Sequence, residues 1–198
     1  MSRLNAPLRQ REKFAALNRV GCQTVPALPS APPEGHGVGR MRERLTARIL
    51  LFDAADRLLL MKGRLPSARD AAGAWFTVGG GAEPGESVHQ AAAREVVEET
   101  GFTDVALGPV VWRRTAPYRL PGGELVLFQE HYLVARCAGG EPCRDSWEAH
   151  EIDLVDDIRW WTLAELRACE EDIYPPDLRD LLPEILAGRY PDEPLVIR

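Results

Sequence analysis

Three glutamates, Glu95, Glu98 and Glu99, stand close together in the chain with the spacing i, i+3 and i+4. On an α-helix this spacing projects the three carboxylates from one face. Crowded carboxylates repel one another unless a cation lies between them, and hard divalent cations such as Mg²⁺ bind oxygen ligands and share them with substrate phosphates. The pattern therefore predicts a divalent-metal site, with a solvated acidic helix face as the alternative.

Two neighbouring features favour the metal site. Helix electrostatics favour acidic residues in the first turn and basic residues in the last, so three glutamates late in a helix do not serve helix stability. A run of glycines at 79–81 precedes the helix, and glycine lets the backbone approach a ligand closely. The glycine turn and the glutamates are therefore predicted to form one site.

The element that must position these glutamates is a helix over 87–100. Ser87 and Gln90 form a capping-box pattern at its start, and the alanines at 91–93 are strong helix formers. Gly101 stands where helices commonly end in the left-handed conformation. The residues expected on the core-facing side are His89, Ala93, Val96 and Val97.

With these residues in place, the stretch 80–102 resembles the Nudix box of the Nudix hydrolase family without a departure. The matching positions are Gly80, Glu86, Arg94, Glu95, Val96, Glu98, Glu99, Gly101 and Phe102. The resemblance implies a loop–helix–loop that binds Mg²⁺ or Mn²⁺ and positions a diphosphate for hydrolysis. It implies that the three glutamates are metal ligands and that Gly80 contributes backbone to the metal site.

The resemblance also implies roles for residues beside the metal ligands. Arg94 and Glu86 would hold the loop and the helix together, and Arg94 and Tyr118 are the residues expected to contact the substrate. ADP-ribose hydrolases of the family tend to carry a proline where Pro117 stands, and diadenosine polyphosphate hydrolases a tyrosine where Tyr118 stands. These adjacent residues satisfy both rules, so the nucleotide stays open.

A general base must take a proton from the attacking water, and several carboxylates are candidates for this role. The resemblance allows a box glutamate, Glu98 or Glu95, or a glutamate from a later loop. Glu151, in an acidic segment, is the loop candidate. Glu130, beside His131 in a predicted strand, is a further candidate, for which a solvent-facing position is the favoured interpretation.

Apolar segments predict strands and helices over the rest of the chain. Pro117 and Tyr118 are expected in a loop, and Trp112, Trp160 and Trp161 in the core rather than against a nucleobase. Irregular alternation with hairpins favours an α/β fold, an α/β/α sandwich with a mixed β-sheet between helices, as the Nudix resemblance over 44–186 also implies. The predicted strands are 46–53, 57–62, 75–78, 105–115, 125–134 and 158–161, and the other predicted helices are 163–170 and 178–187.

Size and composition bound the organisation of the chain. Its 198 residues, 45% of them hydrophobic, suit one domain, placed at 44–198 after a flexible N-terminal extension at 1–43. Met41 is hypothesised to be the true translation start. The net charge of −6 argues against a broad electrostatic grip on nucleic acid. The expected partner is a small nucleoside diphosphate derivative, with a homodimer also compatible.

The cysteines indicate the compartment. Cys22, Cys137, Cys143 and Cys169 form no C-x-x-C pair, so reduced thiols in a cytoplasmic protein are expected. No apolar run in the sequence has the length of a membrane span.

Three functional hypotheses follow from the motif. The first is a metal-dependent hydrolase that cleaves a phosphoanhydride bond in a nucleoside diphosphate linked to another moiety, such as a nucleotide, a nucleotide sugar or a dinucleotide. The alternative is a non-catalytic, nucleotide-sensing regulator with the same fold, which loss of box carboxylates would favour. An isomerase acting on an isoprenoid diphosphate would need further catalytic Cys and Glu residues, and Cys137 and Cys143 cannot be placed well enough to support it.

Overall fold

The computed structural model describes residues 42–63, 73–119, 124–143 and 155–198. The predicted extension lies outside the described residues up to residue 41, and so does Glu151. The helices are α2 (Val88–Thr100), α4 (Leu163–Ala168) and α5 (Leu178–Leu186). The strands are β1 (Arg42–Phe52), β2 (Leu58–Gly63), β3 (Ala74–Thr77), β4 (Val105–Arg119), β5 (Leu125–Cys137), β6 (Val155–Trp161), β7 (Ile173–Tyr174) and β8 (Leu195–Val196).

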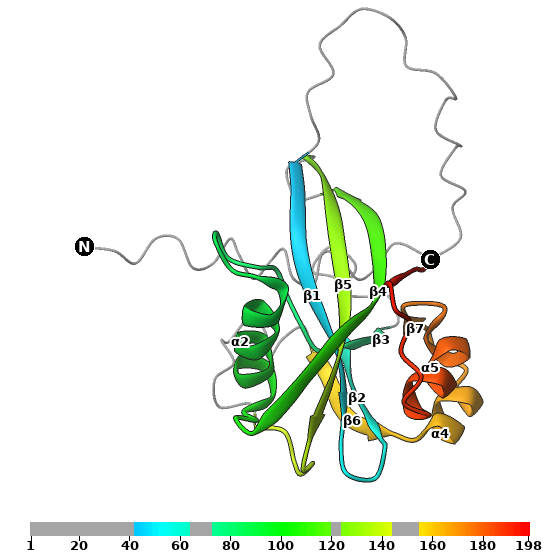
Figure 1. Ribbon diagram of the computed structural model, residues 1–198. Coiled ribbons are helices and arrows are strands. Elements are labelled where there is room, and N and C mark those ends of the chain that lie inside the picture. The colour runs from blue at the N-terminus through cyan, green and yellow to red at the C-terminus, as the bar shows by residue number, and fades with distance from the viewer. Residues whose placement is uncertain (1–41, 64–72, 120–123, 144–154) are drawn as a thin grey trace, which may run out of the picture.

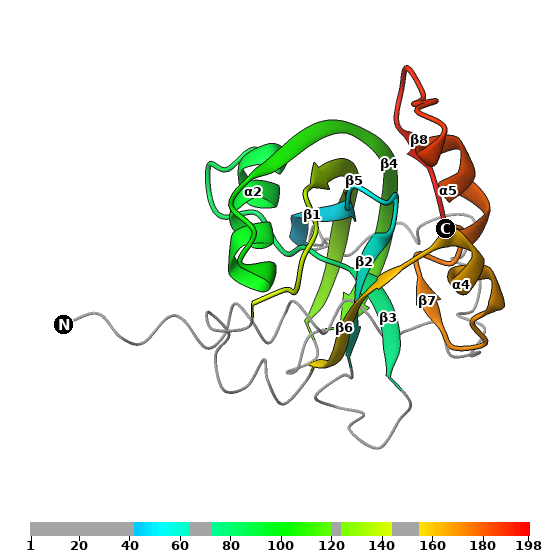
Figure 2. The same cartoon turned by 90° about the horizontal axis from the view of Figure 1, so that it is seen from below.

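The strands form one mixed sheet in the order β7-β3-β2-β1-β5-β4-β8, with β6 also paired to β2. Strand β1 lies at its centre, parallel to β5 and antiparallel to β2. In the parallel pair, Thr46 lies opposite Glu130 and Arg48 opposite Tyr132. Figure 1 shows α2 on one side of the sheet and α4 and α5 on the other, and the view from below in Figure 2 shows the same division.

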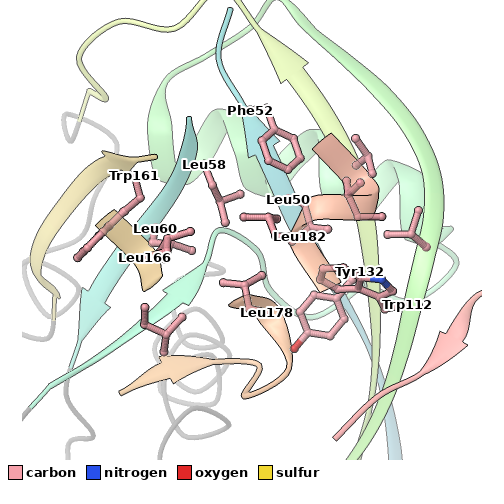
Figure 3. Close-up of a cluster of buried hydrophobic side chains, with 14 of the residues drawn as sticks. Leu50, Phe52, Leu58, Leu60, Trp112, Tyr132, Trp161, Leu166, Leu178 and Leu182 are labelled. Atoms are coloured by element: carbon pink, nitrogen blue, oxygen red, sulfur yellow. The ribbon is translucent and has the colours of Figure 1, made fainter. Parts of the chain in front are cut away.

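Alternation along β1 divides the core into two layers, because successive side chains of a strand point to opposite faces. Ala47, Ile49 and Leu51 belong to the cluster that packs under α2. Leu50 and Phe52 belong to the cluster covered by α4 and α5, which Figure 3 shows together with Trp112, Trp161 and Leu182. The helix–sheet–helix layering is the one predicted from the sequence.

Helix α2 begins and ends as predicted, but its orientation differs from the prediction. Ser87 caps its N-terminus in a full capping box, and Gly101 ends it with φ 74°. Among the residues predicted to face the core, Val96 is buried, whereas Val97 is 42% exposed and His89 and Ala93 are also exposed. The buried side instead contains Ala91, Ala92, Val96 and Thr100 together with Glu95 and Glu99.

The hairpin of β4 and β5 is longer than predicted. Pro117 and Tyr118, expected in a loop, continue β4 and lie opposite Leu127 and Val126 of β5. Trp112 is buried as predicted. No helix in the described part of the chain is both long enough and apolar enough to cross a membrane.

Candidate active site

The turn that precedes α2 is fastened to β1 by backbone hydrogen bonds on both sides of Gly79. Gly79 has φ +136°, and a Cβ there would lie 2.2 Å from the carbonyl oxygen of Ala47. Glycine is therefore required at this position by both backbone conformation and space. The hydrogen bonds run from Ile49 N to Val78 O at 2.8 Å, from Ala47 N to Gly80 O at 2.9 Å and from Ala82 N to Leu45 O at 2.9 Å.

The three glutamates lie at different depths beside this turn. Glu95 is fully buried, Glu99 is buried, and the side chain of Glu98 is 46% exposed. The backbone N–H of Gly79 donates to Glu99 Oε2 at 2.7 Å. A Cβ on Gly80 would lie 2.4 Å from Glu95 Oε1, so the missing side chain makes room for that carboxylate. The prediction that glycine brings the backbone close to these carboxylates agrees with this geometry.

Arg94 joins the turn to the helix. It donates to Glu86, to Glu95 Oε1 at 2.8 Å, to Glu98 Oε2 at 3.0 Å and to the carbonyl oxygen of Gly81 at 3.1 Å. These contacts, two of them to Glu86, use the five N–H donors of a guanidinium. We call Arg94 with Glu86, Glu95 and Glu98 the loop cluster. These contacts hold the turn and α2 together, and the contact of Arg94 with substrate stays a prediction.

In the loop cluster, Arg94 and Glu86 stabilise each other's charged forms. Hydrogen bonds from the Arg94 side chain, with a further one from the backbone N–H of Glu83, lower the pKa of Glu86 to about 2. The same hydrogen bonds to Glu86 raise the pKa of Arg94, against the effect of burial. The pair therefore stays ionised through the neutral pH range and keeps the turn tied to α2.

The donor set fits a divalent cation in chemistry. Glu95, Glu98 and Glu99 offer the hard carboxylate oxygens that Mg²⁺ and Mn²⁺ bind, and the glycine backbone at Gly80 leaves space against Glu95. Within the described ranges, no three His, Cys, Asp or Glu residues are drawn together as a metal cluster. The guanidinium of Arg94 bridges Glu95 and Glu98 there.

The structure says less about the roles of the other predicted site residues. Glu151 lies outside the described residues. Tyr118 lies in β4 opposite Val126, and its assignment to substrate binding stays a prediction. The carbonyl oxygen of Gly80 accepts a hydrogen bond from Ala47 N in the sheet. The Cα of Gly80 lies beside the carboxylate of Glu95.

Glu130 differs from its prediction, because it is buried rather than solvent-facing. It is 2% exposed, and its carboxylate accepts four hydrogen bonds. Burial would raise the pKa of Glu130, but Arg48 and Arg114 outweigh that effect and hold it below its ordinary value. A carboxylate this well paired is a poor general base. The donors are Arg48 Nε at 3.1 Å, Arg48 Nη2 at 3.0 Å, Arg114 Nη1 at 2.9 Å and the Tyr132 hydroxyl at 3.1 Å.

We call Arg48, Arg114, Glu130 and Tyr132 the sheet cluster. The sequence reading missed its two arginines. The sequence held a signal for Arg48, since it stands two residues before the buried Leu50 and so shares its face of an apolar strand. Its partner Glu130, however, lies 82 residues away, and the pairing requires the parallel register of β1 and β5.

Comparisons with known proteins agree with this geometry. A family model described as the NUDIX domain matches residues 42–185. An NAD-capped RNA hydrolase, NudC, of Stutzerimonas stutzeri (strain A1501) is 34% identical over 120 residues, which are 61% of this chain and 37% of that protein. The chain thus matches little more than a third of the length of this relative.

Two solved structures resemble the fold. A MutT protein from Methanosarcina mazei Go1 gives a TM-score of 0.51 at 20% identity, covering 75% of this chain and 96% of the other. An ADP-ribose pyrophosphatase from Streptococcus suis 89-1591 gives 0.50 at 20% identity, covering 78% and 98%. At these identities the likeness concerns the fold.

Proposed function

The chain belongs to the Nudix family, and from that premise we propose that it is a divalent-metal-dependent pyrophosphohydrolase. The bond cleaved is a phosphoanhydride in a nucleoside diphosphate linked to another moiety. One observation carries the proposal: Glu95 and Glu99 are buried against the glycine turn, with Glu99 held by the Gly79 N–H at 2.7 Å and Gly80 leaving room for Glu95. Burying a carboxylate is costly unless it is paired and hydrogen-bonded. Arg94 pairs with Glu95 in this structure, and a bound divalent cation would neutralise Glu95 and Glu99 together.

Glu95, Glu98 and Glu99 would hold the cation, which when bound neutralises phosphate oxygens and lowers the pKa of coordinated water. Other residues of the chain hold these three glutamates in position. Arg94 fixes the turn to α2 through Glu86, and the Gly79 N–H sets the orientation of the Glu99 carboxylate.

A carboxylate is also needed to take a proton from water. Glu98 is the exposed member of the three box glutamates, and we assign the role of general base to it, with Glu151 as the alternative. Glu130 is a poor candidate for this role, because its carboxylate already accepts hydrogen bonds from Arg48, Arg114 and Tyr132.

The substrate class rests on family membership and on the NudC relative. That relative is named for hydrolysis of NAD-capped RNA, and NAD joins two nucleosides through a diphosphate. We propose that the substrate here is a small molecule with such a diphosphate, a dinucleotide or a nucleotide sugar. Action as a cytoplasmic enzyme stays a prediction, as does dimerisation.

The test is hydrolysis of a defined panel. Purified protein with Mg²⁺ or Mn²⁺ is incubated with NAD⁺, ADP-ribose, UDP-sugars, diadenosine polyphosphates and nucleoside triphosphates, and released nucleoside monophosphate or phosphate is measured. We expect metal-dependent release from at least one diphosphate-linked compound, slowed on the order of 100-fold or more in Glu98→Gln. Binding of a panel compound without any release would reject the enzyme and favour the nucleotide-sensing regulator.

A further inference from the structure

The sheet cluster places charges where the fold does not need them. The side chains of Arg48 and Glu130 are 3% and 2% exposed. Removing two charges from water costs several kcal/mol per ion in real proteins, and a well-packed apolar pair is often at least as stable. Stability therefore does not account for this pair, and its other contacts point to another role.

Among the described residues, Arg48 makes one hydrogen bond beyond those to Glu130. Its Nε and Nη2 donate to Glu130 Oε1, which leaves Nη1 directed at the carbonyl oxygen of Gly79, a long hydrogen bond of 3.4 Å. Gly79 is the residue whose own N–H donates to Glu99 Oε2. Contacts thus run without a break from Glu130 through Arg48 and Gly79 to Glu99.

Gly79 needs anchors on both of its peptide groups. Glycine has no Cβ, so its backbone is free to adopt many conformations, and φ at Gly79 is +136°. Arg48 secures the carbonyl side and Glu99 the N–H side. Burial lowers the pKa of Arg48, but Glu130, Tyr132 and, with the smallest effect, Glu99 raise it above its ordinary value. The charge of Glu99 therefore acts on Arg48 across the turn.

We propose that Arg48, held by Glu130, is a positioning residue that fixes the backbone of Gly79 and, through it, the orientation in which Glu99 binds metal. This inference rests on the proposed function, because it assigns a purpose to Glu99 as a ligand. Partners that orient metal ligands typically contribute 10-fold to 100-fold to metal affinity. The side chain of Arg48 acts in this way from the face of β1 that points away from α2.

Arg114 provides a matched control. It also pairs with Glu130, through Nη1 to Oε2 at 2.9 Å, but no hydrogen bond from it to Gly79 is seen among the described residues. Arg114→Gln should therefore weaken the sheet cluster without touching the turn. Because Arg48→Met alone would leave Glu130 short of a partner, the test variant is the double change Arg48→Met with Glu130→Gln, which keeps the net charge of the cluster at +1.

The experiment measures two quantities besides activity. The first is the Kd for Mn²⁺ without substrate, from the electron paramagnetic resonance signal of free Mn²⁺. The second is the hydrogen-exchange rate of the Gly79 amide relative to that of the Ile49 amide, which donates to Val78 in the same bridge. General loosening would speed both amides alike, so their ratio isolates the turn.

For the double variant we expect an Mn²⁺ Kd raised about tenfold or more and a raised Gly79-to-Ile49 exchange ratio, with Arg114→Gln close to wild type in both. Wild-type values in the double variant, or the same changes in Arg114→Gln, would overturn the positioning role. If the wild-type protein hydrolyses nothing in the panel, the proposed function fails, and the exchange ratio still decides whether Arg48 fixes the turn.

Discussion

The loop cluster and the sheet cluster are built from the same chemistry, arginine forked onto carboxylate, but they lie in different surroundings. Arg94 and Glu86 are partly exposed, with side-chain exposures of 24% and 19%. Arg48 and Glu130 are almost fully enclosed. Both sets of arginine contacts reach the same turn, at Gly81 in one case and at Gly79 in the other.

The difference teaches how burial decides what an ion pair does. In the loop cluster, water reaches Glu98, whose side chain is 46% exposed, so this carboxylate can change partners at modest cost. Glu95 is buried and is paired with Arg94. In the sheet cluster, any lost partner leaves a charge stranded in a low dielectric. The first cluster suits an exchangeable site for a cation, and the second suits a fixed support beneath it.

The sharpest test of this contrast is Glu130→Gln. The buried Arg48 and the partly buried Arg114 would lose their anion, and breaking a buried pair in this way costs about 3–5 kcal/mol of unfolding free energy. Urea denaturation of variant and wild type measures the difference. A loss no larger than that of Glu184→Gln, which breaks the exposed pair with Arg189, would show that the sheet cluster is not a desolvated pair.

The opposite behaviour is expected of Glu98→Gln. This side chain is half exposed, so the fold should hold while turnover falls on the order of 100-fold or more, through loss of the proposed metal ligand and general base. Steady-state rates with Mg²⁺, alongside a thermal melt, separate the two effects. Near-normal turnover here and in Glu99→Gln would remove the proposed mechanism.

Gly79 and Gly80 show a similar contrast within one turn. A Cβ at Gly80 would meet the carboxylate of Glu95, the end of a flexible side chain, whereas at Gly79 it would meet the backbone of Ala47. Gly80→Ala should thus shift Glu95 and lower activity about tenfold with little loss of stability. Gly79→Ala should instead destabilise the fold. Equal melting temperatures for the two variants would contradict this assignment.

The smallest expected effect is on acid stability. The pKa of Glu86 is about 2 in the folded protein against an ordinary 4.5, so its ionised form stabilises the fold above pH 4.5 and this contribution is lost as the pH falls towards 2. Glu86→Gln should cost about 1 kcal/mol at neutral pH, because the pair with Arg94 is partly exposed, with the difference vanishing in acid. A difference that is constant from pH 7 to pH 2 would show that Glu86 is not the titrating group.

What the sequence could predict follows the same division. The loop cluster is local: Glu86, Arg94 and Glu98 lie within thirteen consecutive positions, and helix geometry together with the capping residues Ser87 and Gln90 places them. The layered fold was also accessible, because strand and helix periodicities differ.

The sheet cluster could not be predicted in this way. Its partners are joined only by the register of β1 against β5, which no local pattern specifies. The burial of Glu95 and Glu99 was missed for a related reason. Apolarity alone was used to choose the inner face of α2, and Val97 was placed inside, whereas the turn at 79–81 draws two glutamates inward instead.

The central position of β1 has a consequence for how this chain can change over evolutionary time. Its backbone at Leu45, Ala47 and Ile49 holds the glycine turn, while the side chain of Arg48 reaches that turn from the other face. Because side chains alternate with a period of two, deleting one residue before Arg48 would turn the arginine under α2 and send an isoleucine among the charges. We therefore expect this strand to tolerate exchanges of residue type far better than any change in its length.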